Sequence, residues 1–210
     1  MVRVKICGIT NLEDALQAVE SGADVLGFIM FKGSKRYISP KEVRNITKNL
    51  PPFIAKVGVF VNEDRASVLE ILSYAGLDFA QLHGDETVNY CKYIGKERVI
   101  KVFRLKSENE IAKIKEFETV SKAILLDTYS EKSYGGTGKS FDWKIAVKVK
   151  ESISIPLILS GGLNLNNVKE AIKTVEPFAV DVCSGVEEEP GRKNHNLVRD
   201  FIRAVKCNSC

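Results

Sequence analysis

Two short segments of this sequence end an apolar run on a side chain that can exchange a proton. The run VKICGIT (4–10) places Cys7 after its apolar residues and Gly8 after the cysteine, and AILLDT (123–128) places Asp127 near its end. If both runs are parallel strands of one sheet, their carboxyl ends meet at one site. A thiolate can remove a proton and a carboxyl group can donate one, so the pair predicts acid/base chemistry.

Each of these residues also has an ordinary structural interpretation. A free cysteine beside valine and isoleucine is most often a small buried apolar residue, and an aspartate after a strand often caps a helix or turn. Gly8 follows Cys7 directly, where nearby N–H groups can stabilise a thiolate, which favours a base. Thr128 and the long loop after it offer no helix for Asp127 to cap, which favours an acid.

Glycine-rich sequences at two later positions indicate a phosphate site. SGG (160–162) and CSG (183–185) each follow an apolar run and expose backbone N–H groups, as the phosphate loops of barrels do. Tight turns are the alternative explanation for either loop alone. The loop YGGTGKS (134–140) has serine at position 133 where a Walker A motif requires glycine, so we expect it to be a mobile cover over the site instead.

The elements that must position these residues alternate along the whole chain. Apolar, β-rich runs are separated by patterns of helical period, and Thr10 with Glu13 forms a capping box before the first helical pattern, which ends at Gly22. Eight strands are expected, at residues 2–6, 24–29, 55–60, 79–82, 98–102, 123–126, 155–159 and 178–182. Eight similar strand–helix units favour a closed (β/α)₈ barrel over an open doubly wound sheet, which is the alternative.

Length and composition agree with one α/β domain. The chain has 210 residues, of which 44% are apolar, enough to bury one large core. We therefore expect a single-domain (β/α)₈ TIM barrel at residues 1–206, followed by a short C-terminal tail at 207–210.

Charge and hydropathy argue against several classes of partner. The 31 basic and 27 acidic residues are mixed along the chain and leave a net charge of +4, so nucleic acid is not expected. No signal peptide is recognisable, and no run approaches the roughly 18 apolar residues of a membrane helix, so we expect a cytoplasmic protein without a membrane partner.

The five cysteines lack the spacing of a disulfide framework and are expected to be free thiols. The CNSC sequence at 207–210 has the spacing of a metal-ligand pair, but no second ligand pair accompanies it.

Nine segments in the same order resemble the phosphoribosylanthranilate isomerase family of tryptophan biosynthesis, and together they run from the first strand to the last. They are KICGIT (5–10), GADVLGFI (22–29), SKRYIS (34–39), VGVFVN (57–62), QLHGDE (81–86), LLDT (125–128), GGTGKSFDW (135–143), LSGGLNLNNV (159–168) and FAVDVCSGVE (178–187). Nine linked motifs are far more specific than any one of them.

The resemblance implies an Amadori rearrangement of N-(5-phosphoribosyl)anthranilate to 1-(2-carboxyphenylamino)-1-deoxyribulose 5-phosphate, without cofactor or metal. Asp127 matches the general acid of the family, which protonates the ribose ring oxygen so that the ring opens to a Schiff base. Cys7 matches the general base, which as a thiolate removes the proton from C2. The reaction needs one acid and one base with different proton affinities, and these two residues can supply them.

The resemblance also implies the residues that bind a small phosphorylated substrate. Arg36 matches the arginine that holds the anthranilate carboxylate, a task suited to its planar fork of donors. His83 stands at the fourth strand tip and lines the site in a role that stays open. The other substrate-binding residues fall in the motifs of the seventh and eighth strands: Gly161, Gly162, Asp181, Ser184 and Gly185. The oligomeric state is open between monomer and homodimer.

Two departures from the family pattern bear on substrate binding. Cys183 stands where the family commonly has serine, beside the expected phosphate, and Lys32 with Gly33 replaces a proline before Ser34. A looser loop at Gly33 is expected to weaken the placement of Arg36, and with it substrate binding, before it affects the chemistry.

Two alternative functions are a phosphosugar isomerase of histidine biosynthesis, which runs the same rearrangement, and a non-catalytic phosphate-binding barrel. The histidine-pathway family has a carboxylate at the first strand tip, whereas this chain has Cys7 there. This difference favours the resemblance to phosphoribosylanthranilate isomerase over the histidine-pathway alternative.

Overall fold

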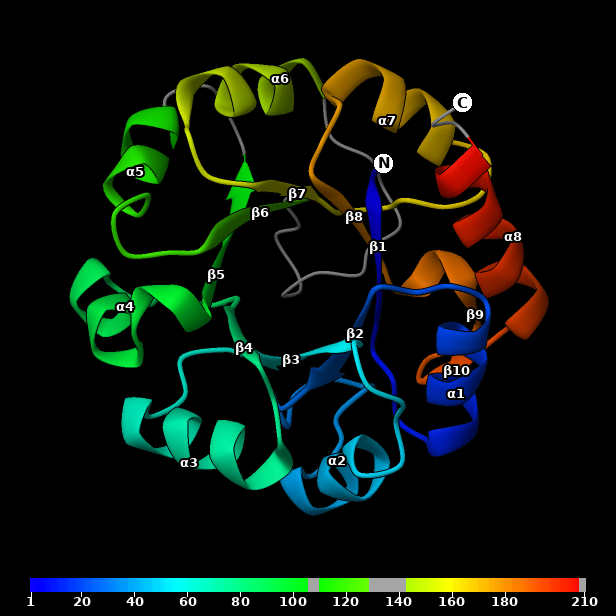
Figure 1. The fold of residues 1–210 in the computed structure, drawn as a ribbon. Coiled ribbons are helices and arrows are strands. Elements are labelled where there is room, and N and C mark those ends of the chain that lie inside the picture. The colour runs from blue at the N-terminus through cyan, green and yellow to red at the C-terminus, as the bar shows by residue number, and fades with distance from the viewer. Residues whose placement is uncertain (106–109, 129–142, 208–210) are drawn as a thin grey trace.

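Eight parallel strands close into a barrel, and the helices cover its outside (Figure 1). The computed structural model describes residues 1–105, 110–128 and 143–207. Each strand pairs with the next, and β1 also pairs with β8, which closes the ring. The strands are β1 (Arg3–Cys7), β2 (Val25–Ile29), β3 (Ala55–Phe60), β4 (Phe79–Leu82), β5 (Val99–Leu105), β6 (Ala123–Thr128), β7 (Leu157–Leu159) and β8 (Ala179–Val182).

The predicted (β/α)₈ barrel is therefore confirmed, and every expected strand is found within a few residues of its expected position. An α-helix follows each strand within the described residues. These are α1 (Leu12–Glu20), α2 (Pro40–Thr47), α3 (Arg65–Ala75), α4 (Val88–Ile94), α5 (Ile111–Glu116), α6 (Trp143–Ser152), α7 (Val168–Val175) and α8 (His195–Lys206). The expected cover at 134–140 and tail residues 208–210 lie outside the described residues. No helix in the described part of the chain combines the length and the apolar character needed to cross a membrane.

Alternation along the strands sorts the side chains into two layers of different character. Outward residues such as Ile6 and Phe28 join the main core beneath the helices. Inward residues of the lower barrel form a second apolar cluster of Val57, Ile100, Val102, Ala123, Leu125, Ile158 and Ala179. Two residues further along three strands, the inward side chains are polar and buried: Gln81, Asp127 and Asp181. An apolar floor thus lies beneath a polar layer at the carboxyl ends of the strands.

The first helix begins differently from the prediction, and the expected capping box is wrong. Asn11 is the N-cap residue, because its side-chain oxygen accepts a hydrogen bond from the backbone N–H of Asp14 at 2.8 Å. The Thr10 hydroxyl instead donates to the carbonyl of Gly191, far along the chain. The helix ends at Glu20, and Gly22 forms the turn after it with φ of +99°.

A short antiparallel hairpin, absent from the sequence-based prediction, precedes α8. It consists of β9 (Glu187–Glu189) and β10 (Arg192–Lys193), and it follows the 3₁₀ helix η3 (Ser184–Val186). Gly191 makes the turn with φ of +91°. The hairpin brings Glu187 and Lys193 next to the carboxyl end of β1 and β8, where the site described below is formed.

Candidate active site

Cys7 and Asp127 both lie at the carboxyl ends of their strands and both face the barrel interior. Cys7 ends β1 and is 5% exposed, and Asp127, near the end of β6, is 4% exposed. The interior direction of Asp127 follows from Leu125, two residues earlier, which belongs to the apolar floor. Because β7 and β8 separate their strands, the thiol and the carboxyl group occupy different parts of the barrel mouth.

Lys5 lies beside Cys7 inside the barrel, a residue that the sequence analysis did not select. Its Nζ is 2.9 Å from an Asp181 carboxylate oxygen, and it also donates a hydrogen bond to the Cys7 sulfur. A side-chain carbon at Gly27 would lie 2.8 Å from the Cys7 sulfur and 2.9 Å from Lys5 Nζ, so glycine leaves room for both. Burial lowers the pKa of Lys5, but the charges of Asp181 and Cys7 reverse this and raise it above the ordinary value.

The environment of Cys7 favours its thiolate. The largest cause is a hydrogen bond from the thiol of Cys183, which outweighs the effect of burial, and the charge of Lys5 acts in the same direction. Together they lower the pKa of Cys7 to about 6. The same hydrogen bond, followed by burial, raises the pKa of Cys183. At neutral pH, Cys7 is therefore the thiolate and Cys183 the protonated partner.

Arg36 reaches this part of the site from the loop after β2, where Glu187 holds it. The guanidinium donates through Nε to both carboxylate oxygens of Glu187 at 2.8 and 3.0 Å, and through Nη2 at 2.6 Å. Glu187 also accepts from Lys193 Nζ at 2.8 Å. The hydrogen bond with Glu187 raises the pKa of Arg36, and Arg36 and Lys193 together outweigh burial and lower the pKa of Glu187.

The loop that carries Arg36 is closed by local hydrogen bonds despite the missing proline. The Ser34 hydroxyl accepts from the backbone N–H of Arg36 at 3.1 Å, and the Ser34 N–H donates to the Phe31 carbonyl at 3.0 Å. Among the described residues, Nη1 of Arg36 donates no hydrogen bond. The arginine is thus fixed in place and keeps one donor group for another acceptor.

His83 and Asp127 are brought together on the other side of the barrel mouth. Nε2 of His83 lies 3.2 Å from a carboxylate oxygen of Asp127, at an angle outside that of a hydrogen bond. Their strands, β4 and β6, are separated only by β5. His83 therefore lies next to the predicted acid, a neighbour that the sequence did not reveal.

A buried ion pair shapes the loop after β4, which includes His83. Nζ of Lys101 is 2.7 Å from Glu86 and donates to the carbonyls of Leu82 and Gly84 at 3.1 and 2.8 Å. The Glu86 carboxylate in turn accepts from the backbone N–H of Gly84 at 3.0 Å. These bonds hold the residues before and after His83, so they fix the backbone that carries its ring.

Arg104 is a further residue that sequence reasoning missed, because β5 continues beyond its expected end at Val102. In the strand register it lies opposite Asp127, and its Nη2 is 3.7 Å from a carboxylate oxygen of Asp85. A residue two positions after Val102, which belongs to the apolar floor, faces the interior as well. Arg104 thus adds a cation next to the predicted acid.

The glycine loops after β7 and β8 pack against each other. Gly161 and Gly162 have φ of +88° and +68°, and the Gly162 carbonyl accepts from the side-chain amides of Asn164 and Asn167 at 3.1 and 3.0 Å. A side-chain carbon at Gly185 would collide with the Leu163 carbonyl. In the described part of the chain, the N–H groups of Gly161 and Gly162 donate to no protein acceptor. The two loops therefore form one surface with unused backbone donors.

Asp181 and Ser184 lie on either side of Cys183, below and beside these loops. The Asp181 carboxylate is buried inside the barrel, where it pairs with Lys5 and lies 3.3 Å from the Ser160 hydroxyl. Ser184 begins η3 together with Gly185. The alternation of β1 could have pointed to Lys5, since it shares a face with Cys7. Glu187 ends the segment FAVDVCSGVE (178–187), but nothing local in that segment pairs it with Arg36, and no sequence signal identifies Lys193 as part of the site.

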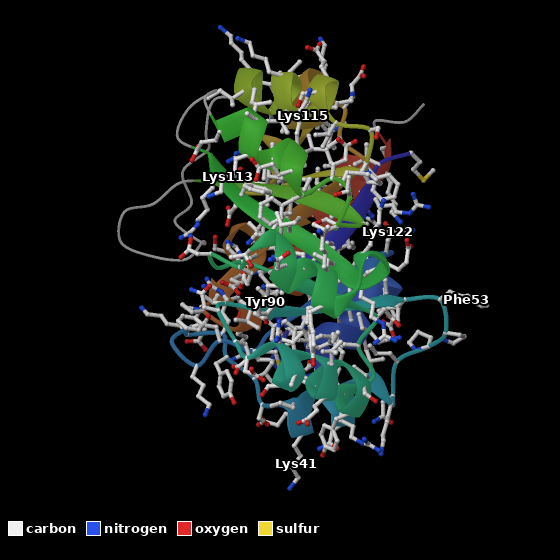
Figure 2. All side chains as sticks on the ribbon, turned by 90° about the vertical axis from the view of Figure 1, so that its left-hand side faces the viewer. Lys41, Phe53, Tyr90, Lys113, Lys115 and Lys122 are labelled. Atoms are coloured by element: carbon white, nitrogen blue, oxygen red, sulfur yellow. The ribbon has the colours of Figure 1, made fainter. Side chains whose placement is uncertain are left out.

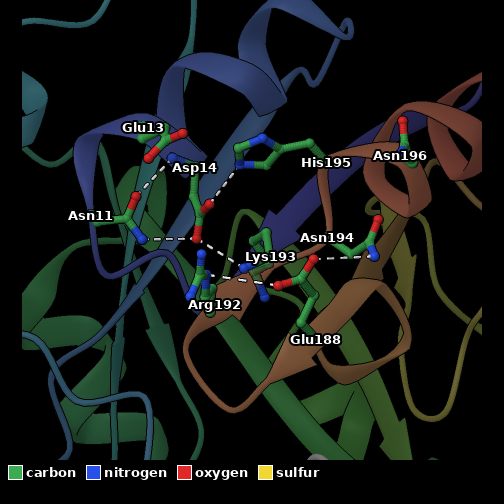
Figure 3. Close-up of a pocket in the computed structure, with 9 residues that line it drawn as sticks. All are labelled: Asn11, Glu13, Asp14, Glu188, Arg192, Lys193, Asn194, His195 and Asn196. Carbon is green, nitrogen blue, oxygen red and sulfur yellow. Dashed lines mark hydrogen bonds and ion pairs between the residues drawn. The ribbon is translucent and has the colours of Figure 1, made fainter.

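A separate pocket lies between α1 and the β9–β10 hairpin (Figure 3). Asp14 lies at its base and accepts from Asn11 Nδ2 at 2.8 Å and from the backbone N–H of Lys193 at 2.9 Å, and it pairs with His195 Nε2 at 2.8 Å. The side chain of Lys193 extends the other way, to Glu187. The pocket residues thus hold the hairpin that supports Arg36.

Comparisons with known proteins show the family of this chain. Residues 4–204 match the family model described as N-(5'phosphoribosyl)anthranilate (PRA) isomerase. The chain is 53% identical over 207 residues to N-(5'-phosphoribosyl)anthranilate isomerase of Thermotoga neapolitana, covering 98% of this chain and 99% of that protein.

Solved structures give the same result. The chain is similar to phosphoribosyl anthranilate isomerase from Thermotoga maritima, with a TM-score of 0.92, 48% identity and coverage of 99% of this chain and all of that one. A complex of such an isomerase with reduced 1-(o-carboxyphenylamino)-1-deoxyribulose 5-phosphate has a TM-score of 0.87, 45% identity and coverage of 99% and 100%. A third structure, described as monomers of the dimeric Thermotoga maritima enzyme, has a TM-score of 0.88, 46% identity and the same coverage. The resemblance seen in the sequence is confirmed, and the chain belongs to the phosphoribosylanthranilate isomerase family.

Proposed function

We propose that Asp127 is the general acid and Cys7 the general base of the family's reaction in this protein. The reaction converts N-(5-phosphoribosyl)anthranilate to 1-(2-carboxyphenylamino)-1-deoxyribulose 5-phosphate. The observation that carries the assignment is the thiolate-favouring environment of Cys7 at the same barrel mouth as Asp127. A base with a pKa of about 6 is ionised at neutral pH and close enough to that pH to accept a proton.

The first step is ring opening. The Asp127 carboxyl group donates its proton to the furanose ring oxygen while the bond between C1 and that oxygen breaks, and the lone pair of the anthranilate nitrogen forms the C1=N bond of a protonated Schiff base. His83 lies beside the carboxyl group, with Nε2 3.2 Å from a carboxylate oxygen, and the Glu86–Lys101 pair holds the loop of His83. Positioning of this kind keeps the acid directed at one oxygen of the substrate.

The second step is proton removal at C2. The Cys7 thiolate takes this proton, and the electrons of the C2–H bond neutralise the Schiff base to give an enolamine. The enolamine gains a proton at C1 and loses its hydroxyl proton at C2, which gives the ketone. Lys5 stabilises the thiolate by charge, and we assign Asp181 to holding Lys5 rather than to contacting the substrate.

Substrate binding uses the two ends of the substrate. Arg36 holds the anthranilate carboxylate with the donor that Glu187 leaves unused, since a guanidinium suits a carboxylate. The backbone N–H groups of the loops at 160–162 and 183–185, with Gly161, Gly162, Ser184 and Gly185, hold the phosphate. The complex of a similar isomerase with a phosphorylated product analogue supports a phosphorylated ligand.

The test is the decay of phosphoribosylanthranilate fluorescence, coupled to the next enzyme of the pathway, for wild type, Cys7→Ser and Asp127→Asn. We expect each variant to lose about 10²- to 10⁴-fold in kcat, the usual contribution of a general acid or base. Cys91→Ser is the matched control, because Cys91 is buried in α4 outside the site. Activity of Cys7→Ser equal to that of Cys91→Ser would refute the assignment of the base.

We also infer that the protein forms a homodimer through the loop before β3. The side chain of Phe53 is fully exposed, has φ of +69°, and projects from the face where the strands begin, away from the active site (Figure 2). Burial of a phenylalanine side chain against a second copy would contribute about 1.5–3 kcal/mol to association. A similar isomerase from Thermotoga maritima is described as dimeric, which supports a second copy as the partner.

Sedimentation equilibrium of wild type and Phe53→Glu tests this inference. We expect the wild type to sediment as a dimer and Phe53→Glu as a monomer, because a carboxylate in an apolar contact loses its hydration. Tyr93→Glu, at a half-exposed aromatic residue on α4, is the control and should remain dimeric. A monomeric wild type would refute the dimer.

A further inference from the structure

Cys7 ends β1, and Cys183 directly follows β8, the strand paired with β1. The register of β1 with β8 pairs Lys5 with Asp181 and Ile6 with Val182, so the next residues along both chains are Cys7 and Cys183. Lys5 and Asp181 meet inside the barrel, and two residues later the side chains return to the same face. Both cysteine side chains therefore point into the barrel mouth side by side.

The distance between such positions suits a disulfide. Neighbouring strands lie about 4.7–4.9 Å apart, and disulfide-bonded residues have Cα atoms about 4.4–6.8 Å apart. The Cys183 sulfur also lies close to the residue that follows Cys7, because a side-chain carbon at Gly8 would lie 2.8 Å from it. The two cysteines therefore stand on adjacent backbone segments whose spacing a disulfide can span.

The two thiols also differ in the way that peroxide-sensitive pairs differ. Cys7 is the thiolate, with a pKa of about 6, and Cys183 keeps its proton and is the more exposed of the two. Lys193 Nζ lies 4.0 Å from the Cys183 sulfur, and the Glu187 carboxylate oxygen that pairs with Lys193 lies 3.9 Å from the same sulfur, so an ion pair borders the two cysteines. A thiolate of low pKa with a second cysteine beside it is the arrangement in which oxidation stops at a reversible disulfide.

We propose that Cys7 and Cys183 form a reversible disulfide when the protein meets a hydroperoxide. The Cys7 thiolate attacks the terminal peroxide oxygen, the O–O bond breaks, and the departing oxygen takes a proton and leaves as water or an alcohol. The Cys183 sulfur then attacks the resulting Cys7 sulfenic acid, the S–O bond breaks, and the hydroxyl group leaves as water with the Cys183 proton. Two thiols are oxidised, and one peroxide is reduced to water and an alcohol, or to two waters.

The bond has a consequence that rests on the proposed function. A disulfide removes the Cys7 thiolate, so the oxidised protein has no base for proton removal at C2. Because the family commonly has serine at the position of Cys183, the switch belongs to this chain and to any relative with the same pair. Reduction by a dithiol restores both thiols, and with them the activity.

The experiment uses the full chain with Cys207→Ser and Cys210→Ser in every variant, so that the CNSC segment does not compete. Reduced protein is treated with hydrogen peroxide, free thiols are blocked with iodoacetamide, and the peptides are analysed by mass spectrometry. Activity is measured in parallel before and after dithiothreitol. Cys183→Ser is the comparison variant, and Cys91 is an internal reference, because burial raises its pKa to about 11 and keeps it protonated.

We expect a peptide pair linked through Cys7 and Cys183, with at least a 100-fold loss of kcat that dithiothreitol reverses. Cys183→Ser is expected to form no linked pair and to be oxidised further at Cys7, with a loss that dithiothreitol does not reverse. Oxidation of Cys7 to sulfinic acid in both proteins, with no linked pair, would overturn the proposal. A linked pair in a fully active enzyme would establish the disulfide and refute Cys7 as the base, so the two ideas fail separately.

Discussion

The two halves of the barrel mouth hold their reactive groups in different ways. The thiol side, made of Cys7, Lys5, Asp181 and Cys183, lies on the neighbouring strands β1 and β8 and surrounds the base with charged or hydrogen-bonding groups. On the carboxyl side, Asp127 faces His83 and lies opposite Arg104 in the strand register, and the buried Glu86–Lys101 pair acts on the loop of His83. The difference is that the buried ion pair of the thiol side touches the base itself, whereas the buried ion pair of the carboxyl side holds a loop beside the acid.

Loss of the Lys5 charge is expected to have the largest combined effect and tests the thiol side. Lys5→Met removes the cation that favours the Cys7 thiolate and leaves Asp181 buried without its partner. We expect the free energy of unfolding to fall by about 3–5 kcal/mol, and the acidic limb of the kcat/KM profile to move to higher pH. Urea denaturation and a pH–rate profile measure the two effects.

A double variant separates the two effects of this change. Lys5→Met with Asp181→Leu replaces the whole buried pair by apolar side chains, which often costs little stability. Stability should therefore return toward the wild-type value, while the acidic limb lies between those of wild type and Lys5→Met, because the Asp181 charge that raises the pKa of Cys7 is lost as well. If activity returned together with stability, the charge of Lys5 would have no role in the chemistry and the comparison would fail.

Breaking the ion pair of the carboxyl side is expected to have a smaller effect on chemistry. Glu86→Gln leaves the Lys101 cation buried and only partly compensated, so we again expect a loss of about 3–5 kcal/mol in the free energy of unfolding. kcat should fall because His83 and Asp127 are held less firmly. The acidic limb should stay near pH 6, since it reports Cys7. If the acidic limb of the kcat/KM profile moved as far as in Lys5→Met, the thiol side and the carboxyl side would not act separately on the pKa of Cys7.

The fold could be predicted because its signal is local and repeated. Alternating apolar runs and helical periods depend on neighbouring residues, and the motifs around Cys7 and Asp127 mark the ends of strands. The first helix cap could not be predicted, since Thr10 and Asn11 are both good cap residues. The choice depends on Thr10 bonding to the Gly191 carbonyl, 181 residues away. A contact between residues far apart in the sequence therefore determines which residue caps the first helix.

The same reason explains which site residues were found. Cys7, Arg36, His83 and Asp127 lie in recognisable motifs, so their presence in the site could be expected. Glu187 reaches Arg36 through a hairpin of five strand residues that carries no clear periodic pattern. The hydrogen bond between Cys183 and Cys7 depends on the pairing of the last strand with the first, which appears only when the barrel closes.

Cys183→Ala gives the finest test of the thiol side, because it removes one hydrogen bond and no charge. The Cys183 thiol is the largest cause of the low pKa of Cys7, so its loss should raise that pKa. Below its pKa the base is protonated and inactive, so kcat/KM falls as the pH falls, and the limb near pH 6 should move upward. A hydrogen bond to a charged group is worth about 1.5–3 kcal/mol, which corresponds to about one to two pH units.

The conservative variant decides what this displacement means. Cys183→Ser keeps a hydroxyl donor at the same position, so its limb should lie between those of wild type and Cys183→Ala, while a merely structural role for the side chain would leave all three limbs at the same pH. The absorbance of the thiolate near the ultraviolet edge, followed across the same pH range, assigns the limb to Cys7 directly. If neither variant moved the limb, Lys5 would be the main source of the low pKa. The thiol side would then rest on the same kind of buried ion pair as the carboxyl side, differing only in that its cation touches the reactive group.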